Sequence, residues 1–182
     1  YSKNLQNMND IRSSVYAQKV ELLLRLIPIV MEEHVFAIHG GTAINLFLKD
    51  LPRYSVDIDL TYIPLADRQT SLDDINMHLN VIAERAKKTF KGMHVVTNFS
   101  TCKLLCEYRG KQVKIEVNQT KRGIVGGAVQ SLPLSEKAQE EFSLFCEANV
   151  VPLTQLYGAK LQQHFHANIL VICLMLNTWI FH

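Results

Sequence analysis

Residues 36–63, FAIHGGTAINLFLKDLPRYSVDIDLTYI, decide the fold. The apolar residues 36–38 predict a short strand. Gly40-Gly41 predict a turn where no Cβ keeps the backbone away from a ligand. The apolar spacing after the turn predicts a helix that opens at Thr42. A helix N-terminus behind a glycine turn offers free N–H groups, which suit a phosphate.

The end of this stretch, SVDIDLTYI, alternates with a period of two and predicts a second strand. Asp57 and Asp59 therefore lie on one face, and the apolar residues between them lie on the other. Two carboxylates about 7 Å apart repel each other unless a cation lies between them. Oxygen ligands of this kind suit Mg²⁺. Taken alone, an Asp-x-Asp pair is more often a solvated sheet face.

The combined pattern is far more specific than its parts. A GG-T turn, a short helix and then R-x-S-x-D-x-D-L resemble the polymerase-β-like nucleotidyltransferases. More narrowly, the pattern resembles the AbiEii toxin family of bacterial abortive-infection systems. The resemblance covers roughly residues 20–160.

The resemblance implies a site for a nucleoside triphosphate and two Mg²⁺ ions. Its metal ligands would be Asp57 and Asp59. Its phosphate or nucleotide contacts would be Gly40, Gly41, Thr42, Arg53 and Ser55, with Lys160 from the later segment LYGAK.

Residues 93–118 also alternate and predict an antiparallel meander of strands over 93–98, 101–109 and 111–118. In VKIEVN the apolar residues face inward, so Lys114 and Glu116 share the other face. Glu116 can therefore be a third carboxylate beside the aspartates, or a surface glutamate paired with a lysine across the strands. The resemblance implies a third acid on this strand, as metal ligand or proton acceptor. A glutamate here reaches further than the usual aspartate.

The remaining segments predict supporting structure. Residues 11–33 are expected to form an amphipathic helix, and Ser71 with Asp74 predicts a capping box that opens a second one. Residues 121–135 are expected to be a loop and residues 140–152 a returning strand. A last helix is expected to be capped by Thr154. Its inward residues would be Leu156, Tyr157 and Leu161.

Beyond Lys160 the resemblance breaks. The family continues as A-A-L-x-R-Q-H-P-R-D-x-F-D into a helical domain, whereas this chain reads LQQHFHANILVICLMLNTWIFH. Permitted codons for this tail, read two nucleotides later, encode AAALSRQHPRDMFDVKHL. We hypothesise a frameshift near codon 161, which the coding DNA tests directly. An exposed apolar tail would favour a homodimer.

Composition sets wider limits. The chain has 182 residues, 48% of them apolar, which is enough to fill one core. Its net charge of +2 gives no global basic field for nucleic acid. Its four cysteines lack metal spacing and are expected to be reduced thiols. The apolar run in the tail, about a dozen residues, is too short for a membrane span of about 20.

The sequence therefore predicts an α+β fold with a polymerase-β-like nucleotidyltransferase core, a mixed sheet flanked by helices, and no C-terminal helical domain. Residues 1–35 would be an N-terminal helix, 36–162 the core and 163–182 the apolar tail. The expected function is Mg²⁺-dependent transfer of NMP from an NTP to an acceptor such as tRNA, by a toxin in the bacterial cytoplasm with a cognate antitoxin. The alternatives are an inactive remnant that binds nucleotide and Mg²⁺, and an interaction protein.

Overall fold

The computed structural model describes residues 2–49, 51 and 54–158, with side chains from residue 15 onward. The helices are α1 (Ser2–Met31), α2 (Gly40–Thr42), the π-helix η1 (Ala43–Leu48), α3 (Arg68–Thr89), the short 3₁₀-helix η2 (Phe99–Thr101) and α4 (Glu136–Phe142). The strands are β1 (Phe36–His39), β2 (Asp57–Tyr62), β3 (His94–Asn98), β4 (Lys103–Tyr108), β5 (Lys111–Val117), β6 (Gln130–Pro133) and β7 (Glu147–Val150).

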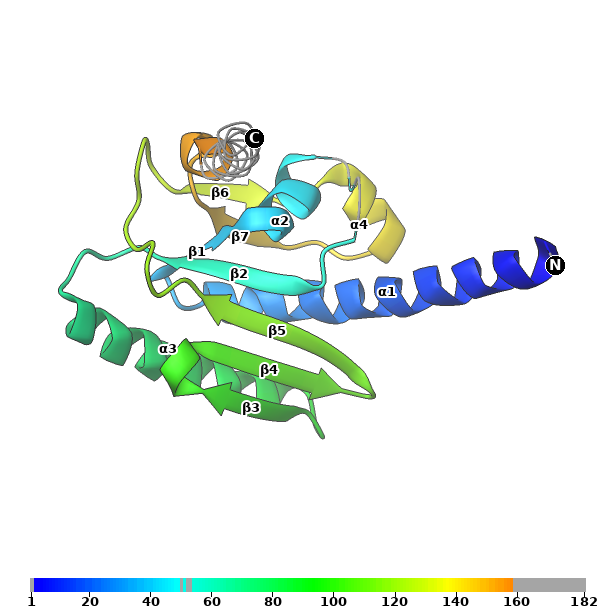
Figure 1. The fold of residues 1–182 in the computed structure, drawn as a ribbon, viewed down its shortest axis with the longest axis horizontal. Helices are drawn as coiled ribbons and strands as arrows, with labels where there is room; N and C mark the ends of the chain where they lie inside the picture. Colours follow the sequence, from blue (N-terminus) through cyan, green and yellow to red (C-terminus); the bar gives the residue numbers. More distant parts are fainter. Residues whose placement is uncertain (1, 50, 52–53, 159–182) are drawn as a thin grey trace, which may run out of the picture.

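In this part of the chain the strands form one mixed sheet in the order β3-β4-β5-β2-β1-β7-β6 (Figure 1). The meander β3-β4-β5 is antiparallel, as its alternating pattern predicts. β5 joins β2 in parallel, and β7 joins β1 in parallel. The fold is therefore α+β with a mixed sheet and flanking helices, which confirms the predicted class.

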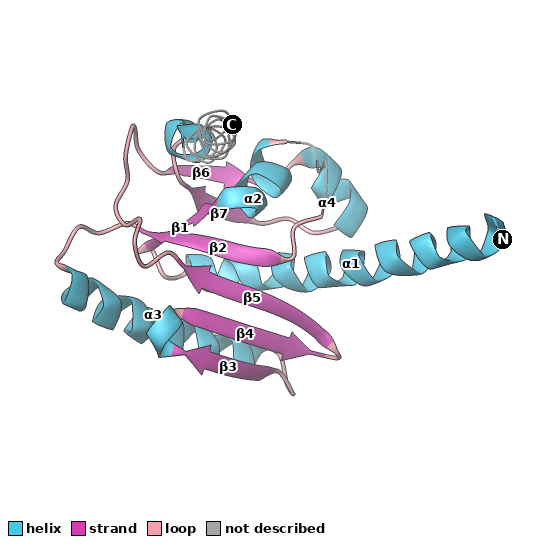
Figure 2. Ribbon diagram, viewed as in Figure 1, coloured by secondary structure: helices cyan, strands magenta, loops and turns pink. Residues whose placement is uncertain are grey.

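Helices α1 and α3 cover one face of the sheet (Figure 2). The predicted apolar stripe of α1 is fully buried; it consists of Val20, Leu23, Leu24 and Ile27. The helix begins at Ser2 rather than at residue 11, and it continues through Pro28 to Met31. Its N-terminal part extends beyond the sheet (Figure 1). The core thus lies between this pair of helices and the sheet.

The start of α3 corrects the predicted capping box. The N-cap is Asp67, whose side chain accepts a hydrogen bond from the Thr70 N–H at 3.1 Å. Ser71 is buried inside the helix and donates to the Asp67 carbonyl at 2.7 Å. Asp74 accepts instead from the Tyr62 hydroxyl on β2, at 2.6 Å. The prediction failed because both side chains are engaged elsewhere.

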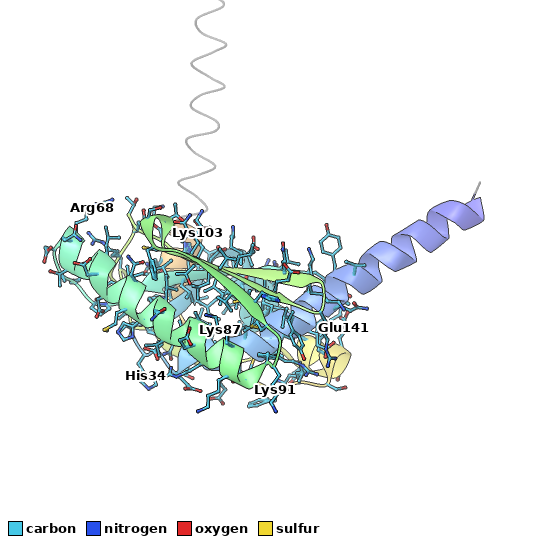
Figure 3. All side chains as sticks on the ribbon, turned by 90° about the horizontal axis from the view of Figure 1, so that it is seen from below. His34, Arg68, Lys87, Lys91, Lys103 and Glu141 are labelled. Atoms are coloured by element: carbon cyan, nitrogen blue, oxygen red, sulfur yellow. The ribbon has the colours of Figure 1, made fainter. Side chains whose placement is uncertain are left out.

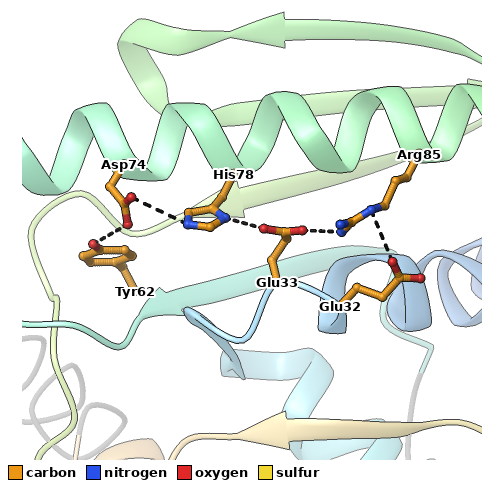
Figure 4. A network of polar contacts seen from close by, with 6 residues as sticks. All are labelled: Glu32, Glu33, Tyr62, Asp74, His78 and Arg85. Atoms are coloured by element: carbon orange, nitrogen blue, oxygen red, sulfur yellow. Dashed lines mark hydrogen bonds and ion pairs between the residues drawn. The ribbon is translucent and has the colours of Figure 1, made fainter.

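Asp74 belongs to a chain of polar contacts, the covered network, formed by Tyr62, Asp74, His78, Glu33, Arg85 and Glu32 (Figure 4). His78 Nε2 lies 3.6 Å from Asp74 Oδ1, and His78 Nδ1 hydrogen-bonds Glu33. Arg85 donates to the other Glu33 oxygen. The network therefore ties the end of α1 to α3 and to the buried end of β2.

The C-terminal part departs from the predicted elements in three places. The expected loop 121–135 contains strand β6, which pairs with β7. The expected strand 140–152 is the end of α4 followed by the shorter β7. Residues 153–158 are helical, but the Thr154 hydroxyl donates to the Gly126 carbonyl rather than capping that helix.

Two further expectations concern single side chains and thiols. Leu156 is buried as predicted, whereas Tyr157 is 40% exposed, so its inward placement was wrong. Cys102, Cys106 and Cys146 are buried free thiols, in keeping with the reduced state expected. Cys173, Leu161 and the apolar tail lie outside the described residues. Among the helices that the structure describes, none is long and apolar enough to cross a membrane.

Candidate active site on the open sheet face

Strand β2 separates a buried face from an open one, as its alternation predicts. Ile58, Leu60 and Tyr62 are buried toward the helices. Asp57 and Asp59 lie on the opposite face and are partly exposed. The two carboxylates are therefore held by a strand whose other face is fixed in the core.

The Gly-Gly turn lies directly against this acid pair. Gly40 has a φ of +71°, and a Cβ added there would lie 2.9 Å from Asp59 Oδ2. Both the backbone conformation and the space therefore require glycine at this position. The helix begins at Gly40 rather than at Thr42, and after Thr42 it continues as the π-helix η1.

Thr42 and Ser55 connect the turn to the start of β2. Their hydroxyl oxygens are 2.7 Å apart, and Thr42 also donates to the main-chain carbonyl of Asp57. Thr42 is fully buried, while Ser55 is partly exposed. Two side chains that the sequence assigned to one nucleotide site are therefore in contact, although they are far apart along the chain.

Glu116 lies where the alternation places it. In the parallel pairing of β2 with β5, Asp59 is opposite Glu116 and Asp57 is opposite Lys114. Lys114 Nζ lies 3.1 Å from Glu116 Oε2 and 3.5 Å from Asp57 Oδ2. Lys103, opposite Glu116 on β4, lies 3.0 Å from Glu116 Oε1. The sequence left two alternatives for Glu116, a third carboxylate beside the aspartates or a surface glutamate paired with a lysine. The structure contains both arrangements, because Glu116 lies opposite Asp59 and also contacts Lys103.

These five charged side chains form what we call the open-face cluster: Asp57, Asp59, Glu116, Lys103 and Lys114. Figure 3 shows Lys103 on the side of the sheet away from Lys87 and Lys91 of α3. Cross-strand register continues the row of Asp59 and Glu116 to His39 on β1. The cluster therefore crosses the centre of the sheet, where no helix of the α1–α3 layer covers it.

A cleft of about 380 Å³ opens beside the cluster. Its wall includes Asp59, Glu116 and Lys103, and the segment after β5 adds the polar side chains Asn118 and Gln119. A polar ligand entering this cleft would therefore meet two of the three carboxylates.

The carboxylates differ in their electrostatics. Burial raises the pKa of Asp59, and the charges of Asp57 and Glu116 raise it further, while Lys114 opposes them. Burial also disfavours the charged form of Glu116, but hydrogen bonds from Lys103 and Lys114 outweigh it and lower the pKa of Glu116. The pKa of Lys114 is raised, chiefly by its hydrogen bond to Glu116. Asp59 is thus the acid with the least compensation.

The donor set fits a magnesium ion. No three His, Cys, Asp or Glu side chains form a ready-made metal cage within the described residues. Mg²⁺ does not need such a cage, because it is commonly held by one or two carboxylates, waters and substrate phosphates. Asp59 fits this role, since burial and the neighbouring Asp57 charge raise its pKa more than Lys114 lowers it, and a bound cation would relieve that cost.

His39 is a site residue that the sequence reasoning did not single out. It is opposite Asp59 and lines the cleft. Within the described part of the chain its buried Nδ1 has no hydrogen-bond partner. Burial and the charge of Lys121 lower its pKa. Its place directly before Gly-Gly, on a strand beside the acids, was the available signal.

Two predicted nucleotide contacts, Arg53 and Lys160, lie outside the described residues. The structure brings together the others: Gly40, Gly41, Thr42, Ser55, Asp57, Asp59 and Glu116. The lysines of the cluster were visible in the sequence only in part. The alternation of VKIEVN put Lys114 on the face of Glu116, but the position of Lys103 depends on the register of β4.

Comparison with known proteins agrees with this geometry. Residues 21–167 match the family described as nucleotidyl transferase AbiEii toxin, type IV TA system. No curated protein and no solved structure matches the chain. The matched segment contains the Gly-Gly turn, the Asp57–Asp59 strand and Glu116, and it spans well over half of the chain. The chain belongs to the AbiEii family of nucleotidyltransferase toxins from type IV toxin–antitoxin systems.

Proposed function

We propose that this chain transfers a nucleoside monophosphate from an NTP to an acceptor, with Mg²⁺ as cofactor and RNA such as tRNA as the acceptor. One observation carries the proposal. Asp59 lies within contact of the glycine turn at Gly40 and opposite Glu116. A phosphate-binding turn and a group of carboxylates therefore meet at one point of the open face.

Asp57 and Asp59, with Glu116, would hold the Mg²⁺ ions. Bound there, Mg²⁺ neutralises phosphate charge and favours ionisation of an attacking hydroxyl. Gly40 and Gly41 let the triphosphate approach the backbone, because no Cβ lies in its way. Thr42 holds this turn against β2 through Ser55 and the Asp57 carbonyl.

Glu116 has two possible roles in this proposal, as metal ligand and as acceptor of the proton from the attacking hydroxyl. Its carboxylate lines the cleft, where an acceptor can reach it. Arg53 and Lys160, carried over from the family pattern, would offset phosphate charge as it develops. Lys103, Asn118 and Gln119 offer hydrogen bonds to a polar acceptor at the cleft wall.

The cellular role proposed is that of a toxin restrained by a cognate antitoxin. The support is the family match over residues 21–167, because that family belongs to type IV toxin–antitoxin systems. A cytoplasmic acceptor such as tRNA would place the activity in the bacterial cytoplasm.

A second candidate is a chain that binds nucleotide and Mg²⁺ without transfer. The observation in its favour is that lysines already contact Asp57 and both oxygens of Glu116. Glu116 would then be an ion-pair partner of the two lysines and would not accept a proton during transfer. Nucleotide binding in the absence of product would select this candidate.

The decisive experiment is incubation with each labelled NTP, Mg²⁺ and total cellular RNA. We expect label in RNA with the native chain and none with the Asp57→Asn, Asp59→Asn double variant. Asp73→Asn is the matched control, since Asp73 is an exposed aspartate on α3, away from the site. Equal labelling by the native chain and the double variant would refute the assigned site.

A further inference from the structure

Two lysines are embedded among the carboxylates, and the proposed transfer gives Lys114 no task. Its ammonium lies between carboxylates of two strands, 3.5 Å from Asp57 Oδ2 and 3.1 Å from Glu116 Oε2. Lys103 contacts one carboxylate among the described residues, that of Glu116 at 3.0 Å. Lys114 is thus the side chain that bridges the acid strand β2 to Glu116 on β5.

The sheet register fixes this placement. Lys114 is opposite Asp57 in the parallel pairing, and it lies two residues before Glu116 on the same face. Its neighbour across β4 is Leu105, which is partly exposed and offers no competing carboxylate. Among the described residues, the charged groups that the Lys114 ammonium contacts are therefore the carboxylates of Asp57 and Glu116.

A divalent cation held by Asp57 and Glu116 would bind the same two carboxylates that the Lys114 ammonium contacts. Two like charges this close repel strongly, and an oxygen that accepts from an ammonium is a poorer metal ligand. The ammonium and the metal ion therefore compete for one position. The two ammonium groups neutralise only two of the three carboxylates. One negative charge is therefore left in the empty site to attract a cation.

The Lys114 ammonium can also move away from the two carboxylates. Its side chain is 37% exposed, and an exposed ion pair holds its partners only weakly. The flexible four-carbon stem lets the ammonium reach a new anion without movement of the strand. A triphosphate arriving at the nearby glycine turn supplies such an anion.

We infer that the Lys114 ammonium acts as an internal counter-cation. It pairs with the metal-binding carboxylates until a nucleotide binds, and it then moves to pair with the nucleotide phosphates. Metal loading would thereby depend on nucleotide, so that the empty enzyme resists divalent ions. The inference rests on the proposed function for the assignment of Asp57, Asp59 and Glu116 to a metal. It adds a regulation of that site, and it assigns Lys114 a positioning role.

The test is a titration with Mn²⁺, followed by calorimetry or by water-proton relaxation, on the full chain. Without nucleotide, Lys114→Met should bind Mn²⁺ about tenfold more tightly than the native chain, because a unit charge near a divalent ion is removed. Lys114→Arg keeps the charge and should stay close to native. With a saturating non-hydrolysable NTP analogue, the advantage of Lys114→Met should shrink.

The matched control is Lys111→Met. Lys111 is on the same strand but faces the helix-covered side, so its loss changes net charge equally without touching the cluster. Lys114→Gln serves as a second neutral variant if the methionine disturbs folding, which circular dichroism reports. Lys103→Met should show a smaller gain, because in the described part of the chain Lys103 contacts Glu116 and neither aspartate.

Equal or weaker Mn²⁺ binding by the neutral Lys114 variants would overturn the inference. So would an equal gain in Lys111→Met, since the effect would then be one of overall charge. The readout needs no transfer reaction. If the native chain transfers nothing but the Mn²⁺ shift is present, the proposed function fails and the counter-cation stands; transfer without the shift gives the reverse result.

Discussion

The two faces of strand β2 carry two clusters of charged groups with opposite character. On the covered face, the network through Tyr62 joins β2 to α3 and the end of α1. On the open face, the cluster around Asp57 and Asp59 joins β2 to β5 and β4. Both contain carboxylates paired with cationic groups at short range, so ion pairing alone does not distinguish them.

Burial and the pairing of individual carboxylate oxygens do distinguish them. The Glu33 side chain is 8% exposed, and each of its oxygens has a fixed partner from α3. The Asp57 side chain is 44% exposed, and among the described residues its ion-pair partner is the Lys114 ammonium at 3.5 Å. Glu33 is thus buried with both oxygens paired, whereas Asp57 is open to solvent and Asp59 has no cation within ion-pair range among the described residues. A complete buried network holds elements together; an incomplete open one is ready for a ligand.

The largest expected difference between the two clusters concerns activity. Asp57→Asn should reduce transfer at least about a hundredfold, because it removes a metal ligand. It should leave thermal stability unchanged or slightly higher, since repulsion with Asp59 is relieved. Glu33→Gln should do the reverse and keep full turnover per folded molecule. The transfer assay and a thermal melt of both variants test this, and unfolding of Asp57→Asn would break the comparison.

The next effect is on stability. Glu33→Gln should lower the free energy of unfolding by about 2 kcal/mol, because Arg85 and His78 lose a buried charged partner. The loss is smaller than for a fully buried pair because the Arg85 side chain is 39% exposed, so water screens its charge. Glu32→Gln is the matched control. Glu32 contacts the same arginine at 3.2 Å but is 59% exposed, so the loss should stay under about 0.5 kcal/mol.

Urea unfolding measures both of these variants. Equal losses for Glu32→Gln and Glu33→Gln would show that burial does not separate the two carboxylates, and would remove the contrast between the covered network and an exposed pair.

The third prediction compares the glycine turn with a glycine remote from the site. Gly40→Ala should cost about 2 kcal/mol, because it adds strain at a φ of +71° to a clash with Asp59 Oδ2. Gly92→Ala has a φ of +88° but nothing within 4 Å of the added Cβ, so it should cost about 1 kcal/mol. Nucleotide binding should weaken in Gly40→Ala only. Loss of binding in both variants would mean that general destabilisation is responsible.

The smallest effect is a change in pH dependence without metal. The raised pKa of Asp59 means that its ionisation disfavours the folded state; this loss of stability develops as pH rises from below 3.8 through the folded pKa. Asp59→Asn should therefore gain stability at pH 7 and lose that gain toward pH 4. Glu116 has a lowered pKa, so Glu116→Gln should lose stability at pH 7 and approach native as pH falls below 4.5.

Unfolding curves in EDTA across this pH range measure both responses. Parallel pH profiles for the two variants would contradict the different compensation of the two acids.

The elements around the site could be predicted because their signals are local. The period-two alternation of β2 fixed which face carries Asp57 and Asp59, since burial of Ile58 and Leu60 allows one register. The same argument placed Glu116 on the open face of β5. Glycine at position 40 was predicted for its lack of a Cβ, and the contact with Asp59 gives the reason.

The errors concern residues with distant partners. Ser71 and Asp74 have the spacing of a capping box, but Asp74 is bound to Tyr62 and His78, and Asp67 is the cap. β6 contains serine and proline and has weak strand propensity, so its pairing with β7 decides its conformation. The place of Lys103 likewise depends on the register between β4 and β5, which a single strand does not reveal.

The parallel pairing of β2 with β5 also has a consequence for the order of folding. Residues 40–56 join β1 to β2, whereas α3 and the strands β3 and β4 lie between β2 and β5 along the chain, so Asp59 and Glu116 are far apart in sequence. Contacts between distant parts of a chain form late, because closing a long loop is entropically costly. Since β5 brings Lys114 together with Glu116, the third carboxylate arrives with its own neutralising charge. We therefore expect Lys114→Met to slow folding, because docking of β5 would then add an uncompensated negative charge to the aspartate pair; stopped-flow refolding of this variant beside Lys111→Met measures it.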